Sequence, residues 1–73
     1  MPHIVVKMYP GTSEENKLKL AQAITKEVTT YTGKPDMAIS VDIIEIAEEL
    51  WMDDVYKTEI TPNLDRLYKK PGY

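Results

Sequence analysis

Two apolar segments that flank one amphipathic segment constrain the fold of this chain more than any other feature. Residues 3–9 and 38–46 are rich in β-branched side chains and predict two strands. Between them, apolar residues recur every three or four positions from about residue 14 to Tyr31, which predicts a helix. Two strands joined by one helix form a βαβ unit, in which the strands are parallel and the crossover is right-handed.

Signals at both ends of the expected helix support its limits. Thr12 or Ser13 is the expected N-cap, because one of them follows the Pro10-Gly11 break. Thr12 and Glu15 also have the spacing of a capping box. Gly33 is the expected C-terminal stop.

The last third of the sequence is less regular. Residues 47–60 predict turns and short helical pieces. Thr61 and Pro62 are typical of an N-cap and a first helical residue, so we expect a short C-terminal helix from about Pro62 to Lys70. No linker divides the chain, and a single domain over residues 1–73 is expected.

A chain of 73 residues is too short to close a large core. Domains near this size bury only about 60–65% of their unfolded surface and usually need disulfides, a metal or a partner subunit. The sequence has no cysteine and one histidine, so we expect no disulfide and no metal site. Two strands and one helix also leave a sheet incomplete. We therefore expect an α/β (α+β) homodimer with a four-stranded sheet, or alternatively a hexamer of three such dimers.

The charge balance argues against two classes of partner. Nine basic and twelve acidic residues give a net charge of -3, which does not suit a phosphate backbone, so nucleic acid is not expected. No apolar run approaches the roughly 20 residues that span a bilayer, and no signal-peptide pattern opens the chain. The expectation is therefore no membrane partner and a cytoplasmic location.

Pro2 is the main candidate for chemistry. If the initiator Met1 is removed, Pro2 has a secondary amine, and α-amino groups ordinarily have a pKa of roughly 7.7–8. Burial lowers the pKa of an amine further, because it disfavours the charged form. A neutral amine can act as a general base toward an acidic carbon–hydrogen bond. The alternative is a proline that merely begins a strand.

The order of these features resembles the 4-oxalocrotonate tautomerase family, small βαβ proteins whose amino-terminal proline is the catalytic base. The resemblance covers about residues 2–51 and consists of Pro2, a strand, residues 11–15, a helix, Pro35 and a second strand. A narrower branch, short dimeric tautomerases that act on phenylpyruvate-like enols, is similar at Trp51, Glu59-Ile60, Pro62 and residues 69–73.

The resemblance implies roles for four positions. Pro2 would move a proton between an enol oxygen and carbon, and Trp51 would form an apolar wall that helps keep the amine neutral. Thr12 and Ser40 stand where hexameric members have arginines that bind the substrate carboxylate and polarise its carbonyl. A hydroxyl does not replace a bidentate arginine contact, so a dicarboxylate is not expected. A small-molecule enol or 2-keto acid with one carboxylate and an apolar or aromatic group, packed on Trp51, fits better.

What replaces these arginines stays open. His3 adjoins Pro2, but successive strand residues point to opposite faces. Ser40 and Thr12 remain candidate substrate-binding residues, with a structural role as the alternative. Lysines, among them Lys7, could supply positive charge from a neighbouring subunit.

The resemblance thus predicts a cofactor-independent keto–enol tautomerase, an isomerase. Two alternatives remain. One is a dehalogenase, hydratase or decarboxylase of the same superfamily, which the missing arginines disfavour. The other is a non-catalytic dimeric scaffold that has lost the substrate arginines; the retained Pro2 and Trp51 disfavour it.

Overall fold

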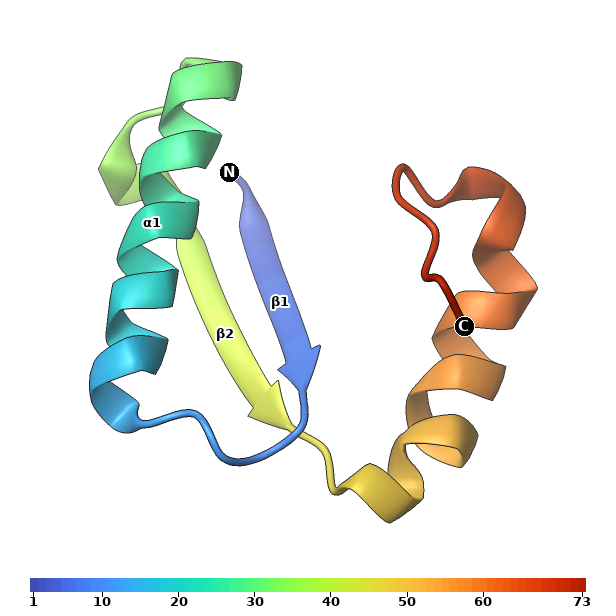
Figure 1. The fold of residues 1–73 in the computed structure, drawn as a ribbon. Coiled ribbons are helices and arrows are strands. Elements are labelled where there is room, and N and C mark those ends of the chain that lie inside the picture. Colours follow the sequence, from blue (N-terminus) through green and yellow to red (C-terminus); the bar gives the residue numbers. More distant parts are fainter.

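The computed structural model describes residues 1–73 and has the expected βαβ order (Figure 1). Strand β1 (His3–Met8) and strand β2 (Ser40–Glu45) form a parallel two-stranded sheet, and helix α1 (Glu14–Thr32) connects them. A single 3₁₀ turn, Asp36–Ala38, precedes β2. The predicted fold class is therefore confirmed, with each strand slightly shorter than predicted.

The register of the strands decides which side chains share a face. Ile4 lies opposite Val41, and Val6 lies opposite Ile43, so the alternating apolar residues of both strands point the same way. Helix α1 lies on this face, where Lys17 Nζ hydrogen bonds to Glu45 at the end of β2. The opposite face carries the other set of side chains, and α1 does not cover it.

The ends of α1 confirm one expectation and correct another. Ser13 is the N-cap, and its hydroxyl accepts a hydrogen bond from the amide of Asn16 at 3.1 Å. The capping box from Thr12 to Glu15 is therefore not formed, because the helix begins one residue later than that motif requires. Gly33 ends the helix in the left-handed conformation, with φ of 74°, and its amide donates to the carbonyl of Thr29.

The C-terminal third is more helical than the sequence predicts. A 3₁₀ turn (Glu48–Leu50) leads into a nine-residue π-helix (Met52–Ile60), and a 3₁₀ helix (Thr61–Arg66) continues directly from it. The expected short C-terminal helix is present as this 3₁₀ helix, which starts within one residue of the predicted position but ends at Arg66 rather than Lys70 and is not separate from the π-helix. Thr61 is not an N-cap but the first residue of the 3₁₀ helix, and its amide and hydroxyl both donate to the carbonyl of Tyr56 one π-turn earlier.

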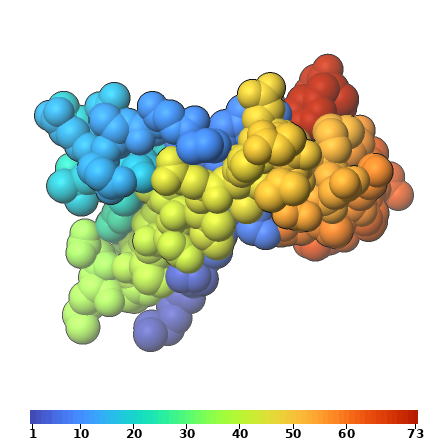
Figure 2. Space-filling model, turned by 90° about the horizontal axis from the view of Figure 1, so that it is seen from below, coloured from blue at the N-terminus to red at the C-terminus, as the bar shows by residue number.

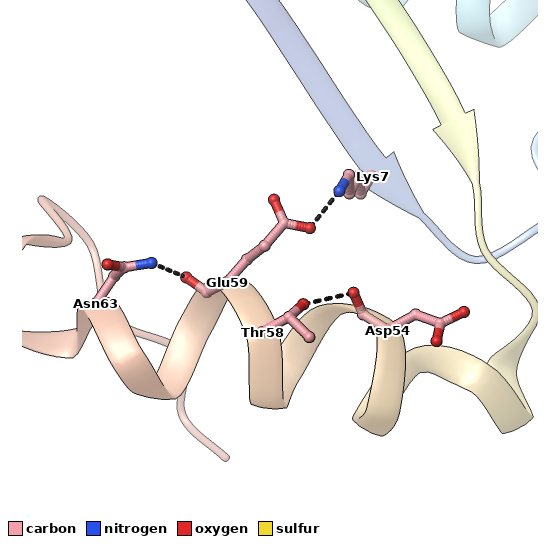
Figure 3. Close-up of polar contacts among 5 residues, drawn as sticks. All are labelled: Lys7, Asp54, Thr58, Glu59 and Asn63. Carbon is pink, nitrogen blue, oxygen red and sulfur yellow. Dashed lines mark hydrogen bonds and ion pairs between the residues drawn. The ribbon is translucent and has the colours of Figure 1, made fainter.

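This C-terminal segment lies apart from α1. It leaves the sheet beyond the end of β2 and runs on the β1 side of the molecule (Figure 1). The space-filling view shows it as an orange and red lobe, joined to the rest through the strands (Figure 2). An ion pair joins Glu59 of this segment to Lys7 of β1 (Figure 3), and a ring contact joins Trp51 to Tyr9, which directly follows β1.

A single chain barely forms a core. Val55, on the π-helix, is the only buried residue and is 5% exposed. Large apolar side chains remain in solvent, including Val5 on β1 at 46% and Leu18 on α1 at 61%. Exposed apolar surface of this extent is typical of a surface that packs against another molecule.

Candidate active site

Three predicted site residues meet where the two strands begin. The amide of Ser40 donates to the carbonyl of Pro2 at 3.2 Å, and Nδ1 of His3 is hydrogen bonded to the hydroxyl of Ser40 at 2.6 Å. Parallel strands in register begin at the same edge of a sheet, so pairing of His3 with Ser40 brings this group together. Met1 precedes it and is 97% exposed. While Met1 is attached, the nitrogen of Pro2 is an amide and has no basicity.

Aromatic side chains gather at the other end of β1. The ring of Tyr9 meets the indole of Trp51 edge to face, with centroids 5.3 Å apart and an interplanar angle of 89°. The indole N–H of Trp51 donates to the hydroxyl of Tyr73 at 2.9 Å. The ring of Tyr73 also lies 5.4 Å from that of Tyr56. Aromatic pairs at such separations add stability beyond the area that they bury, so this cluster holds the chain end against Trp51.

Three of these aromatic residues, Tyr9, Trp51 and Tyr73, line the largest cavity of the chain, which has a volume of about 520 Å³. We call it the aromatic pocket; its lining residues are Lys7, Met8, Tyr9, Pro10, Thr12, Trp51 and Tyr73. Thr12 and Trp51, two predicted site residues, therefore line the same cavity. A mostly apolar and aromatic lining with a few polar groups is typical of a small-molecule site.

A smaller cavity of about 290 Å³ adjoins the aromatic pocket between β1 and the C-terminal segment. Lys7 and Trp51 line both cavities, and Glu59 lines only the smaller one. The Nζ atom of Lys7 is paired with the Glu59 carboxylate (Figure 3). The main chain at Glu59 is itself held, because the amide side chain of Asn63 donates to its carbonyl at 2.9 Å.

Lys7 is the only cationic side chain that lines a cavity of this chain. The single arginine, Arg66, lies in the 3₁₀ helix and donates from Nε to the side chain of Asn63 at 3.1 Å. No group of three or more His, Asp or Glu side chains is placed to hold a metal ion. No helix is long and apolar enough to cross a membrane.

The predicted site residues form two groups rather than one. Pro2, His3 and Ser40 lie at the start of the sheet, whereas Thr12 and Trp51 lie beside Tyr9 at its far end. Seven residues of extended chain separate Pro2 from Tyr9, which corresponds to about 23 Å. One chain therefore does not bring the proline to the aromatic wall.

Sequence reasoning missed several residues of the aromatic pocket. Tyr9 stands two residues after Lys7, so strand alternation already places both side chains on one face. Glu59 and Tyr73 lie in segments that resemble the narrower branch, but no local pattern assigns either of them a contact or a role in a site. They reach β1 and Trp51 from 52 and 22 residues away in the sequence.

Comparison with known proteins identifies related chains and folds. A family model described as tautomerase enzyme matches residues 2–59. The tautomerase PptA of Pectobacterium carotovorum is 43% identical over 74 residues, which cover 100% of this chain and 97% of the relative. A probable tautomerase of Xylella fastidiosa is 36% identical, with 100% and 89% covered.

Solved structures agree with this result. YwhB, a homologue of 4-oxalocrotonate tautomerase, superposes with a TM-score of 0.63 at 34% identity, over 64% of this chain and 77% of its own. TomN, a homologue from the tomaymycin biosynthetic pathway, has a TM-score of 0.67 at 30% identity, over 68% and 77%.

Proposed function

The chain belongs to the tautomerase family, in its 4-oxalocrotonate tautomerase-like group, and we propose that it interconverts the keto and enol forms of a 2-keto acid, with the amine of Pro2 as general base. The proposed substrate has one carboxylate and an apolar or aromatic group, as phenylpyruvate does. The observation that carries this choice is the aromatic pocket, where Tyr9, Trp51 and Tyr73 surround about 520 Å³. Such a wall favours an aromatic ring over a second carboxylate.

In the proposed reaction, one amine carries one proton from the enol oxygen to carbon. The neutral amine of Pro2 takes the proton of the enol hydroxyl, and the enolate carbon then takes that proton back from the ammonium. The carbon–carbon double bond becomes a single bond as the carbon–oxygen bond becomes a carbonyl, so an O–H bond is exchanged for a C–H bond and no electrons enter or leave. The hydrogen bond from Ser40 to the carbonyl of Pro2 fixes the base at the start of β1.

A second copy of the chain would complete this site, and we propose a homodimer. One chain buries only Val55, leaves Val5 largely in solvent, and keeps each strand of its sheet unpaired on one edge. Pairing two β1 strands antiparallel across a two-fold axis gives a four-stranded sheet. That arrangement places Pro2 of one chain near the end of β1 in the other, where the partner's aromatic pocket lies.

The role of Pro2 can be tested directly by ketonisation of phenylenolpyruvate. Pro2→Ala, and separately a Gly-Ser extension that keeps the nitrogen of Pro2 acylated, are each expected to lower kcat/KM at least about a hundredfold, the usual contribution of a general base. Pro62→Ala, in the exposed 3₁₀ helix, is the matched control and should keep full activity.

One further measurement completes this test. Mass spectrometry of the active protein should show a chain without Met1. Undiminished activity in both the Pro2→Ala variant and the extended chain would overturn the proposal and favour a different base. No activity in the unmodified protein toward any enol acid would favour a non-catalytic scaffold.

A further inference from the structure

We propose that Lys7 binds the substrate carboxylate by exchanging its partner Glu59 for the ligand. Lys7 would then bind the carboxylate that arginines bind in the hexameric family members, which have arginines where this chain has Thr12 and Ser40. The proposal deepens the proposed function and rests on it for the identity of the ligand, a monocarboxylate with an apolar or aromatic group. Lys7 suits this role by its position between the two cavities, by its exposed partner Glu59, and because no other cationic side chain lines either cavity.

Lys7 lies at the boundary between the two cavities. It lines both of them together with Trp51, so one ligand could contact the indole and the ammonium group at the same time. The side chain of Lys7 is 31% exposed. A charge-assisted hydrogen bond in such a partly desolvated position is stronger than one between fully solvated groups.

The other cationic side chains do not reach the aromatic pocket. Lys17, Lys19 and Lys57 are paired with acids of their own segments or of β2. Arg66 is bonded to Asn63 in the 3₁₀ helix. The remaining lysines line no cavity: Lys26, Lys34, Lys69 and Lys70.

Replacement of the Glu59 carboxylate by a ligand carboxylate on Lys7 costs little free energy. The side chain of Glu59 is 48% exposed, so its carboxylate can return to water when a ligand takes its place on Lys7. The lysine needs only to turn its flexible stem from the smaller cavity toward the aromatic pocket. In the absence of ligand, the pairing keeps the ammonium group compensated.

A single cation also limits the charge of the ligand. One carboxylate would be paired with Lys7, whereas a second would be held against the aromatic wall without a partner. Burial of an unpaired carboxylate is costly, so the aromatic pocket discriminates against dicarboxylates. The same argument predicts weak binding of an uncharged analogue, which leaves Lys7 with Glu59.

The test uses Trp51 as a reporter, because it is the only tryptophan of the chain. Fluorescence titrations with 3-phenylpropionate and with the uncharged 3-phenylpropanamide compare the two ligands on the intact protein. We expect the carboxylate to bind about tenfold more tightly than the amide, the typical worth of one charge-assisted hydrogen bond. Lys7→Met should remove this preference, and Lys7→Arg should keep it.

Glu59→Gln provides a second variant that leaves β1 unchanged. It frees Lys7 from its partner and should strengthen binding of the carboxylate without affecting the amide. Lys19→Met and Glu15→Gln are matched controls, since they alter an exposed ion pair on α1, and both should keep the wild-type preference.

These readouts separate the proposal from the reaction itself, because ligand binding needs no proton transfer. An unchanged preference in both Lys7→Met and Glu59→Gln would overturn the role of Lys7, even if Pro2→Ala abolishes turnover. The opposite result, a lost preference with turnover that is independent of Pro2, would retain the carboxylate site and contradict only the proposed base.

Discussion

The indole N–H of Trp51 donates to the hydroxyl of Tyr73, 2.9 Å away, so residues 22 positions apart in the sequence form one wall of the aromatic pocket. The same indole meets the ring of Tyr9 edge to face. Trp51 is therefore held from two sides, by the end of β1 and by the C-terminal segment. A side chain held in this way keeps one orientation toward a ligand, which is a condition for a precise binding site.

Tyr73→Phe should remove the hydrogen bond to Trp51 and keep the aromatic ring in the pocket. The ring remains, but water replaces the hydroxyl as acceptor, so Trp51 emission should move to longer wavelength. Loss of one hydrogen bond should raise KM for an aromatic enol acid about fivefold, with kcat nearly unchanged. Tyr68→Phe is the control, since Tyr68 is fully exposed, and it should change neither quantity. An equal effect from both variants would mean that the hydrogen bond has no part in binding.

Mixing two inactive variants tests whether the site spans two chains. Pro2→Ala keeps the aromatic pocket, and Trp51→Ala keeps the base, so a mixed dimer contains one site with both parts. After the two proteins are unfolded and refolded together in equal amounts, activity should recover to about a quarter of the wild-type value, because half of the dimers are mixed and half of their sites are intact. A mixture no more active than its components would place both residues in one chain's site.

Gly33→Ala should destabilise the protein through the backbone alone. Gly33 has φ of 74°, and an added Cβ would meet no atom within 4 Å. The left-handed conformation costs a non-glycine residue about 1 kcal/mol, which should appear as a lower urea midpoint with the same slope. Gly72→Ala is the matched control, because its Cβ would also meet nothing and its φ is not in that region. Equal midpoints for the two variants would contradict this reading of the helix end.

The contribution of Lys17 to the free energy of unfolding should decrease at alkaline pH. Its hydrogen bond to Glu14, with a smaller contribution from Glu45, raises its pKa above the ordinary value of 10.5, although partial desolvation opposes the shift. The folded state thus holds this proton more tightly than the unfolded state does. The contribution is complete below pH 10.5 and is lost as the pH rises through the folded-state pKa.

Urea unfolding of the Lys17→Met variant tests whether this contribution is lost as the pH rises. The wild-type protein should have the higher midpoint at pH 8, and the difference should shrink above pH 10.5. Lys19→Met, which removes a more exposed pair with Glu15, should have little effect at either pH. A wild-type advantage that stays constant with pH would show that Lys17 acts through packing of its stem.

The central part of the fold follows from local pattern. Apolar alternation in β1 and β2, a helical repeat in α1 and the glycine after it are all signals that neighbouring residues generate. The parallel register then brings Ser40 to Pro2 and His3 without further information. That half of the candidate site could be predicted because it depends only on which strands pair and where they begin.

The other half of the candidate site could not be predicted in this way. Lys7 meets Glu59, and Trp51 meets Tyr73, only because the C-terminal segment turns back along β1. That path depends on a π-helix, whose hydrogen bonds span one residue more than those of an α-helix and leave no periodic signal that distinguishes the two. The family resemblance supplied Trp51 and Thr12 as candidates and also covered Glu59 and Tyr73, but it gave no contact for either of these two.

The nearly absent core, with Val55 as its only buried member, has a kinetic consequence for the proposed dimer. A newly made chain cannot remove its apolar surface from water until it encounters another copy, so folding and association become a single second-order process. The rate of maturation then rises with the local supply of chains. At low abundance, each chain would wait longer for a partner and would be exposed to proteases for longer.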